Sequence, residues 1–588
     1  MYPDKILLQA EKPGRYVGNE INMIRKNPRG VTTRFAFAFP DVYEVGMSHN
    51  GLQILYGAFN RREDVYCERT FAPWPDMEAL MRQHGLPLKS LETYSPLASF
   101  DFVGFTLQYE MTYTNILNML HLSNIPIRAA DRNDGHPIIC AGGPCAVNPE
   151  PLADFFDFFF IGEAEEAFDE VFDLYRLHKA SSGGKMAFLE KLAAAVPGVY
   201  VPALYDVKYN TDGTISDFAP NNPYAATRVQ KVFVKDMDAA FYPEAALVPL
   251  IETIHDRAVV ELFRGCIRGC RFCQAGYIYR PHRQKSVRTL FEQARRLLES
   301  SGHEEISLLS LASNDYPHLE QLVDLLCDHF TNEKVSISLP SLRIDATNSN
   351  ILHKVQSVRK SGLTFAPEGG SQRMRDVVKK DITEDDITNG ARLAFEGGWD
   401  RLKLYFIVGL PTEEKSDLTA IGHLSEDLVD VYYTLPKEKR KRPVAITVST
   451  SCFVPKPFTP FQWFRQHTAE EFMDKQKHVK QSIKSRQINY KYHDPETSVI
   501  EGALSRGDRR VAAAIEQAWR LGARFDGWSE HFSGDIWRCA FENAGLSIDF
   551  YAHRQRSYDE ILPWDFIDLR INKEYLIRES QLAKGVTQ

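Results

Sequence analysis

Short hydrophobic runs alternate with amphipathic stretches along most of this chain. Four such runs in the first 180 residues predict buried strands: 33–39, 102–107, 137–141 and 156–161. Helical periodicity at residues 47–60 and 111–122 predicts helices between them. Continuous apolar runs separated by helices are typical of a parallel sheet that is covered on both faces. We therefore expect an α/β fold that begins with a Rossmann-like, doubly wound domain at residues 1–180, with its ligands at the carboxyl ends of the strands.

A second and longer alternation begins after residue 250. Six apolar runs predict strands: 259–263, 305–311, 335–339, 363–366, 401–408 and 444–449. Five helical patterns lie between them: 289–300, 319–329, 350–361, 384–397 and 416–434. Repeated βα units with short loops close into a barrel or partial barrel, whose chemistry lies at the carboxyl ends of the strands. We expect a partial (β/α)6 barrel over residues 251–465.

The remaining segments carry weaker patterns. A Ser–Gly linker signal at 181–184 and two strand patterns predict a small β connector over residues 181–250. Helical patterns at 469–486, 509–521 and 529–544 predict a mainly helical region over residues 466–588. Several domains agree with a length of 588 residues, which is too long for one hydrophobic core.

Composition and charge exclude some classes of protein. The chain is 44% hydrophobic and 25% charged, as ordinary globular proteins are. A net charge of −8 argues against general nucleic-acid binding, and no nucleic-acid module is recognisable. Nine cysteines in 588 residues do not form a disulfide scaffold. We see no signal peptide and no apolar run long enough to span a membrane, so we expect a cytoplasmic protein.

Candidate chemistry is concentrated in one loop. Cys266, Cys270 and Cys273 stand at the spacing C-x3-C-x2-C without a fourth cysteine nearby. Iron–sulfur clusters are held by thiolates from such short runs, and three ligands for a cubane leave one iron open. The segment 262–291 has no acidic residue but seven cations, which suits an anionic group. Spacing alone leaves two alternatives: a zinc site with His282 as fourth ligand, or three unrelated thiols.

The loop resembles the signature of the radical SAM enzymes. This resemblance implies that the three cysteines hold a catalytic [4Fe–4S] cluster whose open iron binds S-adenosylmethionine (SAM). One electron, delivered by a donor such as flavodoxin or ferredoxin, would cleave SAM to methionine and a 5′-deoxyadenosyl radical. In this family, an aromatic residue at the position of Phe272 lies near the adenine.

The ends of the predicted barrel strands also resemble this family. A Ser-x-Arg element at 341–343 ends in Arg343, and the resemblance assigns Glu368 to the SAM ribose. Gly409 ends the fifth strand, as in many relatives. The usual Gly-Gly-Glu after the second strand is missing, so Ser313 or Asp315 is expected to receive the SAM amino group.

The N-terminal domain resembles that of the cobalamin-binding class of these enzymes. Gly142 and Gly143 form a turn that lets a backbone approach a bulky ligand, although a tight turn needs glycine for its own sake. The stretches 148–151 and 161–163 share the resemblance. Tyr43 stands where many cobalamin domains have a cobalt-ligating histidine, so we expect cobalt without a protein nitrogen ligand. We predict that His49 is a packed or exposed histidine rather than a ligand.

The resemblance implies a radical SAM enzyme, with cobalamin-dependent C-methylation of an unknown substrate as the preferred chemistry. One alternative is a methylthiotransferase with a second cluster on Cys67, Cys140 and Cys145. Another is an iron–sulfur or zinc module without catalytic activity. The substrate does not follow from fold and cofactor.

Overall fold

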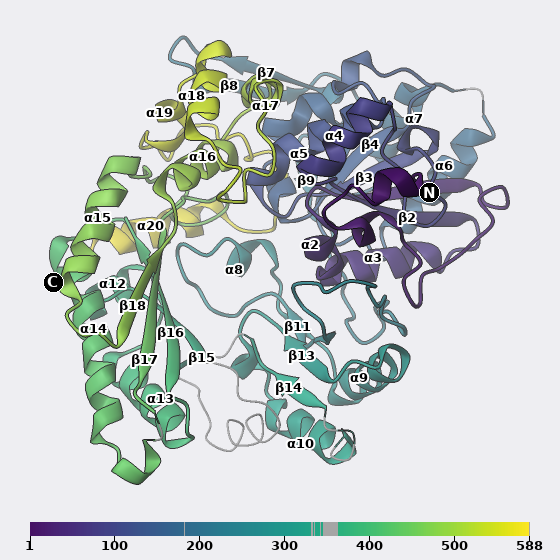
Figure 1. Ribbon diagram of the computed structural model, residues 1–588. Helices are drawn as coiled ribbons and strands as arrows, with labels where there is room; N and C mark the ends of the chain where they lie inside the picture. Colours follow the sequence, from purple (N-terminus) through teal and green to yellow (C-terminus); the bar gives the residue numbers. More distant parts are fainter. Residues whose placement is uncertain are drawn as a thin grey trace.

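The computed structural model describes residues 1–181, 183–330, 333, 335–340, 343–344, 363–440 and 442–586. Ser341 and the helix expected at 350–361 lie outside the described residues. Figure 1 shows an N-terminal α/β domain, a central region of parallel strands with flanking helices, and a set of C-terminal helices against the N-terminal domain.

The N-terminal domain is built on one six-stranded sheet with the strand order β2-β1-β3-β4-β5-β6. Its strands are β1 Thr33–Phe39, β2 Val65–Phe71, β3 Phe102–Thr106, β4 Ile138–Gly142, β5 Phe158–Phe160 and β6 Val199–Tyr200. All neighbours are parallel except β5 and β6. The expected doubly wound sheet is therefore confirmed, and its strand order reverses between β1 and β3. Ligands of such sheets bind where the order reverses.

Seven helices accompany this sheet: α1 Asp4–Leu7, α2 Tyr43–Met47, α3 Asn50–Asn60, α4 Pro75–His84, α5 Tyr113–Leu122, α6 Phe168–Lys179 and α7 Lys185–Ala195. The helix expected at 47–60 begins only at Asn50, because the His49 side chain caps it by accepting the Leu52 N–H. Helices α3 and α6 cover one face, where Phe35 packs against Phe59 and Phe168. Helix α7 was not predicted, since its residues lie in the expected β connector.

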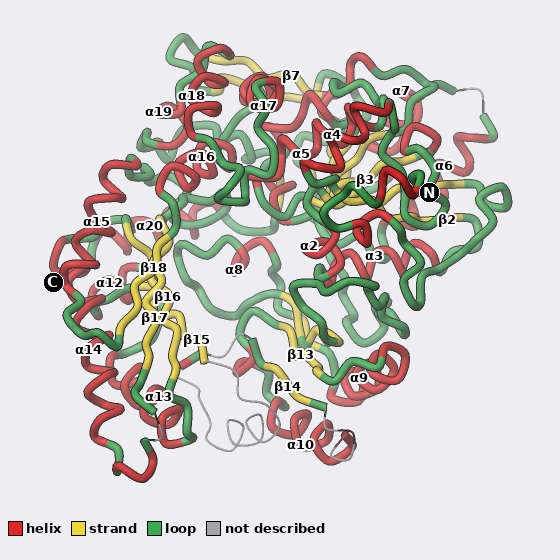
Figure 2. Tube along the Cα trace, viewed as in Figure 1, coloured by secondary structure: helices red, strands yellow, loops and turns green. Residues whose placement is uncertain are grey.

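The predicted barrel strands all form, and their described residues make two parallel sheets (Figure 2). One contains β10 Ala258–Glu261, β13 Glu305–Leu309 and β14 Ser336–Ser338. The other contains β15 Leu363–Glu368, β16 Arg401–Val408, β17 Ala445–Cys452 and β18 Ile488–Tyr492. Strand β18 is a seventh strand beyond the predicted end of the barrel.

Five helices lie where the hydrophobic pattern predicts them: α9 Val287–Ser301, α10 Leu319–Phe330, α13 Glu384–Glu396, α14 Lys415–Thr434 and α15 Ala469–Ser482. Two short helices, α8 Ala275–Ile278 and α12 Gln372–Val377, were not predicted. Smaller strands lie around them: β7 Tyr205–Tyr209, β8 Ile215–Pro220, β9 Val229–Gln230, β11 Phe263–Arg264 and β12 Arg283–Gln284. Among the described residues, no helix is both long and apolar enough to cross a bilayer.

The C-terminal region contains α16 Pro495–Ser505, α17 Val511–Arg520, α18 Gly534–Asn543, α19 Ile548–Ala552, β19 Ile567–Asp568 and α20 Lys573–Lys584. Its buried residues, such as Ile515 and Trp537, belong to the same hydrophobic cluster as the N-terminal sheet. Asn148 donates to the carbonyls of Ser505 and Gly507 at 3.0 Å, and Arg509 pairs with Glu150. The motif at 148–151 therefore joins two parts of the chain.

Candidate functional site

The three motif cysteines lie on a loop between β11 and α8, and each thiol is half-buried. The backbone N–H of Arg268 donates to Cys266 Sγ at 3.4 Å. Burial raises the pKa of Cys270 to about 11, and the Lys380 ammonium nearby opposes this shift. Burial also raises the pKa of the Cys273 thiol, with a smaller contribution from the Glu368 carboxylate. The fold thus brings the loop and the segment after β15 together, as the sequence predicted.

The donor arrangement does not support a zinc site. Within the part of the chain that the structure describes, no group of three or more His, Cys, Asp or Glu side chains is arranged around a single ion. The ring of His282, the fourth zinc ligand considered above, packs against Phe263 with centroids 4.7 Å apart. A cubane cluster does not need sulfurs that converge on one atom, because each thiolate binds its own iron.

Carboxylates from distant segments pair with the arginines of the cysteine loop. Arg268 Nε donates to Asp315 Oδ2 at 3.0 Å, and Arg271 Nε donates to Glu579 Oε2 at 3.0 Å. Arg264, just before the loop, pairs with Glu165 and with Glu261. The local excess of positive charge along the sequence is therefore largely compensated in the fold.

Glu368 ends β15 in a strained backbone conformation. Its φ is +67°, in the left-handed region that non-glycine residues rarely adopt, and the pairing of β15 with β16 shifts register before it. Its Oε1 lies 3.0 Å from Lys380 Nζ, with both side chains largely buried. Burial raises the pKa of Glu368 while Lys380 opposes this shift. Such strain persists where the surroundings hold it, often at functional sites.

Arg343 reaches the same place from the segment after β14. Its Nη2 donates to the Lys380 carbonyl at 3.1 Å, and its backbone N–H donates to Asn314 Oδ1 at 2.9 Å. Two of the expected SAM-binding residues, Arg343 and Glu368, thus lie beside the cysteine loop and share contacts with Lys380.

The other expected SAM contacts have partners within the protein. Ser313 is buried, with its Oγ 2.9 Å from Ser310 Oγ. The Gly409 N–H donates to the Glu413 carboxylate, and a Cβ at Gly409 would lie 2.4 Å from the Phe472 ring. Packing thus already accounts for glycine at 409. Phe272 packs against a buried cluster that includes Met374, Val377 and Phe461. Asp315 is engaged by Arg268, and the roles of these residues toward SAM stay predictions.

A cavity of about 610 Å³ lies between the N-terminal sheet and the barrel. Its walls include the carboxyl ends of β3, β4 and β5 and the ends of β10 and β13. Thr106 and Gly142 line it from the N-terminal domain, Gly265 lines it from the start of the cysteine loop, and Tyr279 lines it from the end of α8. An apolar arm extends to Phe35, Phe59 and Phe168 under α3 and α6. The cavity occupies the position where the strand order reverses, as expected for a ligand site.

Two glycines were predicted in this wall, and the backbone conformation requires glycine at one of them, Gly143. Gly143 has a φ of +104°, and a Cβ there would lie 2.9 Å from the Leu107 carbonyl oxygen. At Gly142, a Cβ would approach the Phe160 carbonyl oxygen at 3.3 Å. Both residues line the cavity. The tight-turn interpretation therefore explains Gly143 without any ligand.

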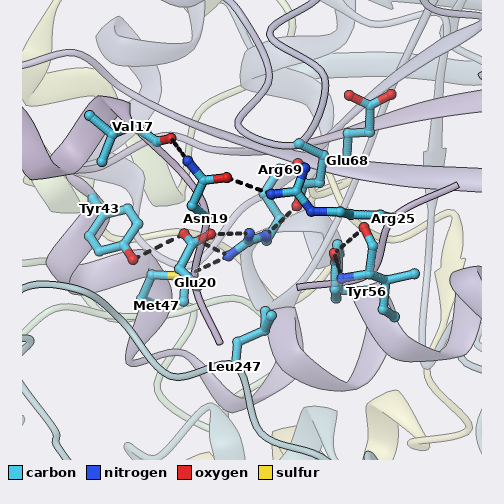
Figure 3. Close-up of polar contacts among 12 residues, drawn as sticks. Val17, Asn19, Glu20, Arg25, Tyr43, Met47, Tyr56, Glu68, Arg69 and Leu247 are labelled. Atoms are coloured by element: carbon cyan, nitrogen blue, oxygen red, sulfur yellow. Dashed lines mark hydrogen bonds and ion pairs between the residues drawn. The ribbon is translucent and has the colours of Figure 1, made fainter. Parts of the chain in front are cut away.

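Tyr43, expected beneath the cofactor, does not line this cavity. Its hydroxyl donates to Glu20 Oε1 at 3.0 Å, and Glu20 in turn pairs with Arg69 (Figure 3). Arg69 is fully buried between Glu20 and Glu92 and anchors the lead-in segment to β2. Sequence patterns do not indicate this cluster, because its members lie far apart along the chain.

His49 lines the cavity instead, although the sequence indicated no role toward a ligand. Its Nδ1 accepts the Leu52 N–H at 3.1 Å, so the neutral ring carries its proton on Nε2. Burial lowers the pKa of His49 to about 4, which keeps the ring neutral at physiological pH. The sequence did contain one indication of this place in the cavity wall: His49 follows β1, at the point where the strand order reverses.

The second-cluster prediction for Cys67, Cys140 and Cys145 is wrong. Cys67 lies on β2 and Cys140 on β4, with β1 and β3 between them. Three strand spacings correspond to about 14 Å, which is too far for ligands of one compact cluster. All three thiols are buried, and burial raises their pKa values well above the ordinary range.

Comparison with known proteins identifies the class. The family model "Radical SAM proteins, N-terminal" matches residues 51–202, and the model of the radical SAM superfamily matches residues 260–424. The chain belongs to the radical SAM superfamily and is an enzyme of the class that uses a [4Fe–4S] cluster and SAM.

Individual relatives are more distant. An uncharacterized protein from Methanocaldococcus jannaschii is 28% identical over 431 residues, covering 72% of this chain and 82% of the relative. A putative methylthiotransferase from the same organism is 24% identical over 190 residues, covering 30% of this chain and 41% of the relative. The radical SAM methyltransferase TsrM from Kitasatospora setae, solved with cobalamin and a [4Fe–4S] cluster bound, has a TM-score of 0.52 at 11% identity, with 87% of this chain and all of TsrM covered. This likeness concerns the fold.

Proposed function

We propose that this protein is a cobalamin-dependent radical SAM enzyme that methylates carbon in a substrate still to be identified, with Cys266, Cys270 and Cys273 as the cluster ligands. The observation that carries the proposal is the cavity between the carboxyl ends of β3, β4 and β5 and the ends of β10 and β13, with Gly265 of the cysteine loop in its wall. A flavodoxin- or ferredoxin-like donor would supply the electron.

The residues around the cysteine loop suit SAM. With SAM bound, the cluster supplies the electron that generates a 5′-deoxyadenosyl radical. Glu368 offers a carboxylate that accepts hydrogen bonds from two ribose hydroxyls. Lys380, 3.0 Å away, keeps this carboxylate ionised and aligned despite its burial. Arg343 donates to the Lys380 carbonyl and thereby holds the segment after α12 that carries Lys380.

The cavity suits a corrinoid, which supplies a transferable methyl group when bound. Its apolar arm of phenylalanines would suit an aromatic part of such a ligand. Its polar wall, with Gln108, Glu163 and Lys231, suits amide side chains that both donate and accept hydrogen bonds. His49 offers an N–H donor rather than a lone pair, because its Nδ1 already caps α3. We therefore retain the prediction of cobalt without a protein nitrogen ligand.

The methylthiotransferase alternative has less support. It needs a second cluster in the N-terminal domain, and two of the cysteines considered for it, Cys67 and Cys140, lie on separated strands. The relative with that name aligns over less than a third of this chain.

Anaerobic reconstitution with iron, sulfide and hydroxocobalamin tests the proposal. We expect the wild type to retain iron and corrinoid and to form 5′-deoxyadenosine from SAM. Ala164 lines the cavity, so Ala164→Trp narrows it and should abolish corrinoid retention while iron and SAM cleavage remain. Ala167, half-buried three residues further on and outside the cavity wall, provides the matched Ala167→Trp control.

The two parts of the proposal fail separately. A reconstituted wild type that neither retains iron nor cleaves SAM would refute the assignment of the cysteine loop. Iron and SAM cleavage without corrinoid retention would refute the cobalamin part alone. Nitrogen splitting in the Co(II) EPR spectrum would contradict the absence of a nitrogen ligand.

A further inference from the structure

The C-terminal helix α20 packs directly beneath the cysteine loop, although some 300 residues separate the two in the sequence. Ala583 of α20 belongs to the same buried cluster as Met374 and Val377 of α12, and Phe272 of the cysteine loop packs against this cluster. Helix α20 thus touches the loop that precedes α8 and also the helix that follows β15. The loop follows β11 of the two-stranded sheet β11-β12, whereas α12 follows β15 of the four-stranded sheet.

One carboxylate on α20 connects both segments. Glu579 Oε2 accepts from Arg271 Nε at 3.0 Å, and Glu579 Oε1 lies 3.2 Å from Lys379 Nζ. Only 6% of the Glu579 side chain and 7% of the Arg271 side chain are exposed. Arg271 also donates to the carbonyls of Asp376 and Val377 at the end of α12. Loss of Glu579 would therefore leave the buried Arg271 guanidinium without its carboxylate, which proteins tolerate poorly.

Both cations lie next to the proposed cluster ligands. Arg271 stands between Cys270 and Cys273, and a Cβ built on Gly269 would lie 3.5 Å from Lys379 Nζ. The charge of groups around an iron–sulfur cluster is one of the factors that set its reduction potential. Partners beyond the ligands themselves also orient the ligands and tune the metal. Glu579 is thus the negative charge that offsets two positive charges at the cluster loop.

We propose that Glu579 is a positioning residue that holds the cysteine loop on α12 and makes the cluster potential more negative by offsetting Arg271 and Lys379. This inference rests on the proposed ligation of the cluster by the three loop cysteines. It assigns to the C-terminal helix a role in the redox chemistry that the sequence did not suggest.

EPR-monitored redox titration of the reconstituted full-length enzyme tests this role. Glu579→Gln keeps the size of the side chain but removes its charge, so the potential should become less negative while iron content stays at the wild-type level. Lys379→Met removes a positive charge at the same place, so the potential should become more negative. Glu579→Asp keeps the charge and should remain nearest to the wild type. Glu574→Gln, at an exposed position on the same helix, should leave the potential unchanged.

The decisive result is a shift of the reduction potential in opposite directions in Glu579→Gln and Lys379→Met. An effect of packing alone would not depend on the sign of the charge that is removed. Equal potentials in the wild type and both variants, or shifts of the same sign, would overturn the inference. If Glu579→Gln loses iron, Lys379→Met carries the test, since it leaves α20 and its carboxylate in place. A wild type that binds no cluster would instead refute the proposed function.

Discussion

Replacing Glu368 with glutamine should weaken SAM binding while leaving the cluster in place. Glu368 is held by its position at the end of β15 and by Lys380 at 3.0 Å, and its side chain is 13% exposed. Glutamine retains the size and the left-handed backbone position, so the change is confined to one negative charge. Glu368 is not one of the three proposed thiolate ligands, so the iron content should stay at the wild-type level.

The size of the effect follows from the two hydrogen bonds proposed to the ribose. A hydrogen bond to a charged group contributes about 1.5–3 kcal/mol, compared with about 0.5–1.5 kcal/mol between neutral groups. The loss for two bonds is about 2–3 kcal/mol, which corresponds to an affinity about 30- to 150-fold lower. In the variant, Lys380 also loses its ionised partner in a largely buried position, which lowers the unfolding free energy of the protein.

Equilibrium binding of SAM to the anaerobically reconstituted protein measures this effect, with 5′-deoxyadenosine formation as a second readout. Glu150→Gln is the matched control, because Glu150 is also buried and paired with an arginine but lies at the junction with the C-terminal helices. It should lower stability without changing SAM affinity. A Glu368→Gln protein with full iron content and a SAM affinity within about twofold of the wild type would refute the ribose assignment; that bound is far below the change expected from the lost hydrogen bonds.

Three further predictions concern the cluster, the buried ion pairs and pH. Joint replacement of the three loop cysteines by alanine should abolish both iron binding and SAM cleavage, and full iron content in that variant would disprove their role. Arg69→Met leaves Glu20 and Glu92 buried without a cation and should cost about 3–5 kcal/mol in unfolding free energy, measured by denaturant titration. Arg295→Met, which removes a surface ion pair on α9, should leave the denaturation midpoint almost unchanged. His49 has a pKa of about 4, below its ordinary 6.5, so its neutral ring stabilises the fold fully above pH 6.5 and this contribution is lost as the pH falls toward 4. This contribution to the unfolding free energy is at most about 3 kcal/mol, because water in the cavity reduces it. A His49→Gln variant should lack this part of the pH dependence of stability. Identical stability–pH profiles for the variant and the wild type would contradict the prediction.

Local pattern was sufficient for the class of fold and for the position of the cysteine loop. Hydrophobic periodicity depends on neighbours within a few residues, and it located strands such as β1, β3 and β16 to within a residue or two. The cysteine spacing and the position of Glu368 after a strand are equally local. Since a parallel strand must end at the same edge as its neighbours, residues at successive strand ends come together without further information.

Strands that mix apolar with polar or charged residues were not predicted by this reasoning. Strand β2 carries Glu68 and Arg69, and β18 alternates apolar with polar residues over only five positions. Their strand conformation comes from pairing with β1 and β17, which were recognisable. Tertiary hydrogen bonding overrides weak propensity in such segments.

The partners within the site were decided by the tertiary structure. Nothing near Cys270 in the sequence indicates that Glu579 would pair with Arg271, and nothing near Tyr43 indicates its burial against Glu20. The cavity likewise exists only because packing brings the carboxyl ends of β3, β4 and β5 close to the ends of β10 and β13. Sequence patterns specify which residues form each strand and which chemistry they carry, because those properties depend on near neighbours. Which charges compensate each other depends on the packing of segments that are hundreds of residues apart, and burial makes that compensation necessary.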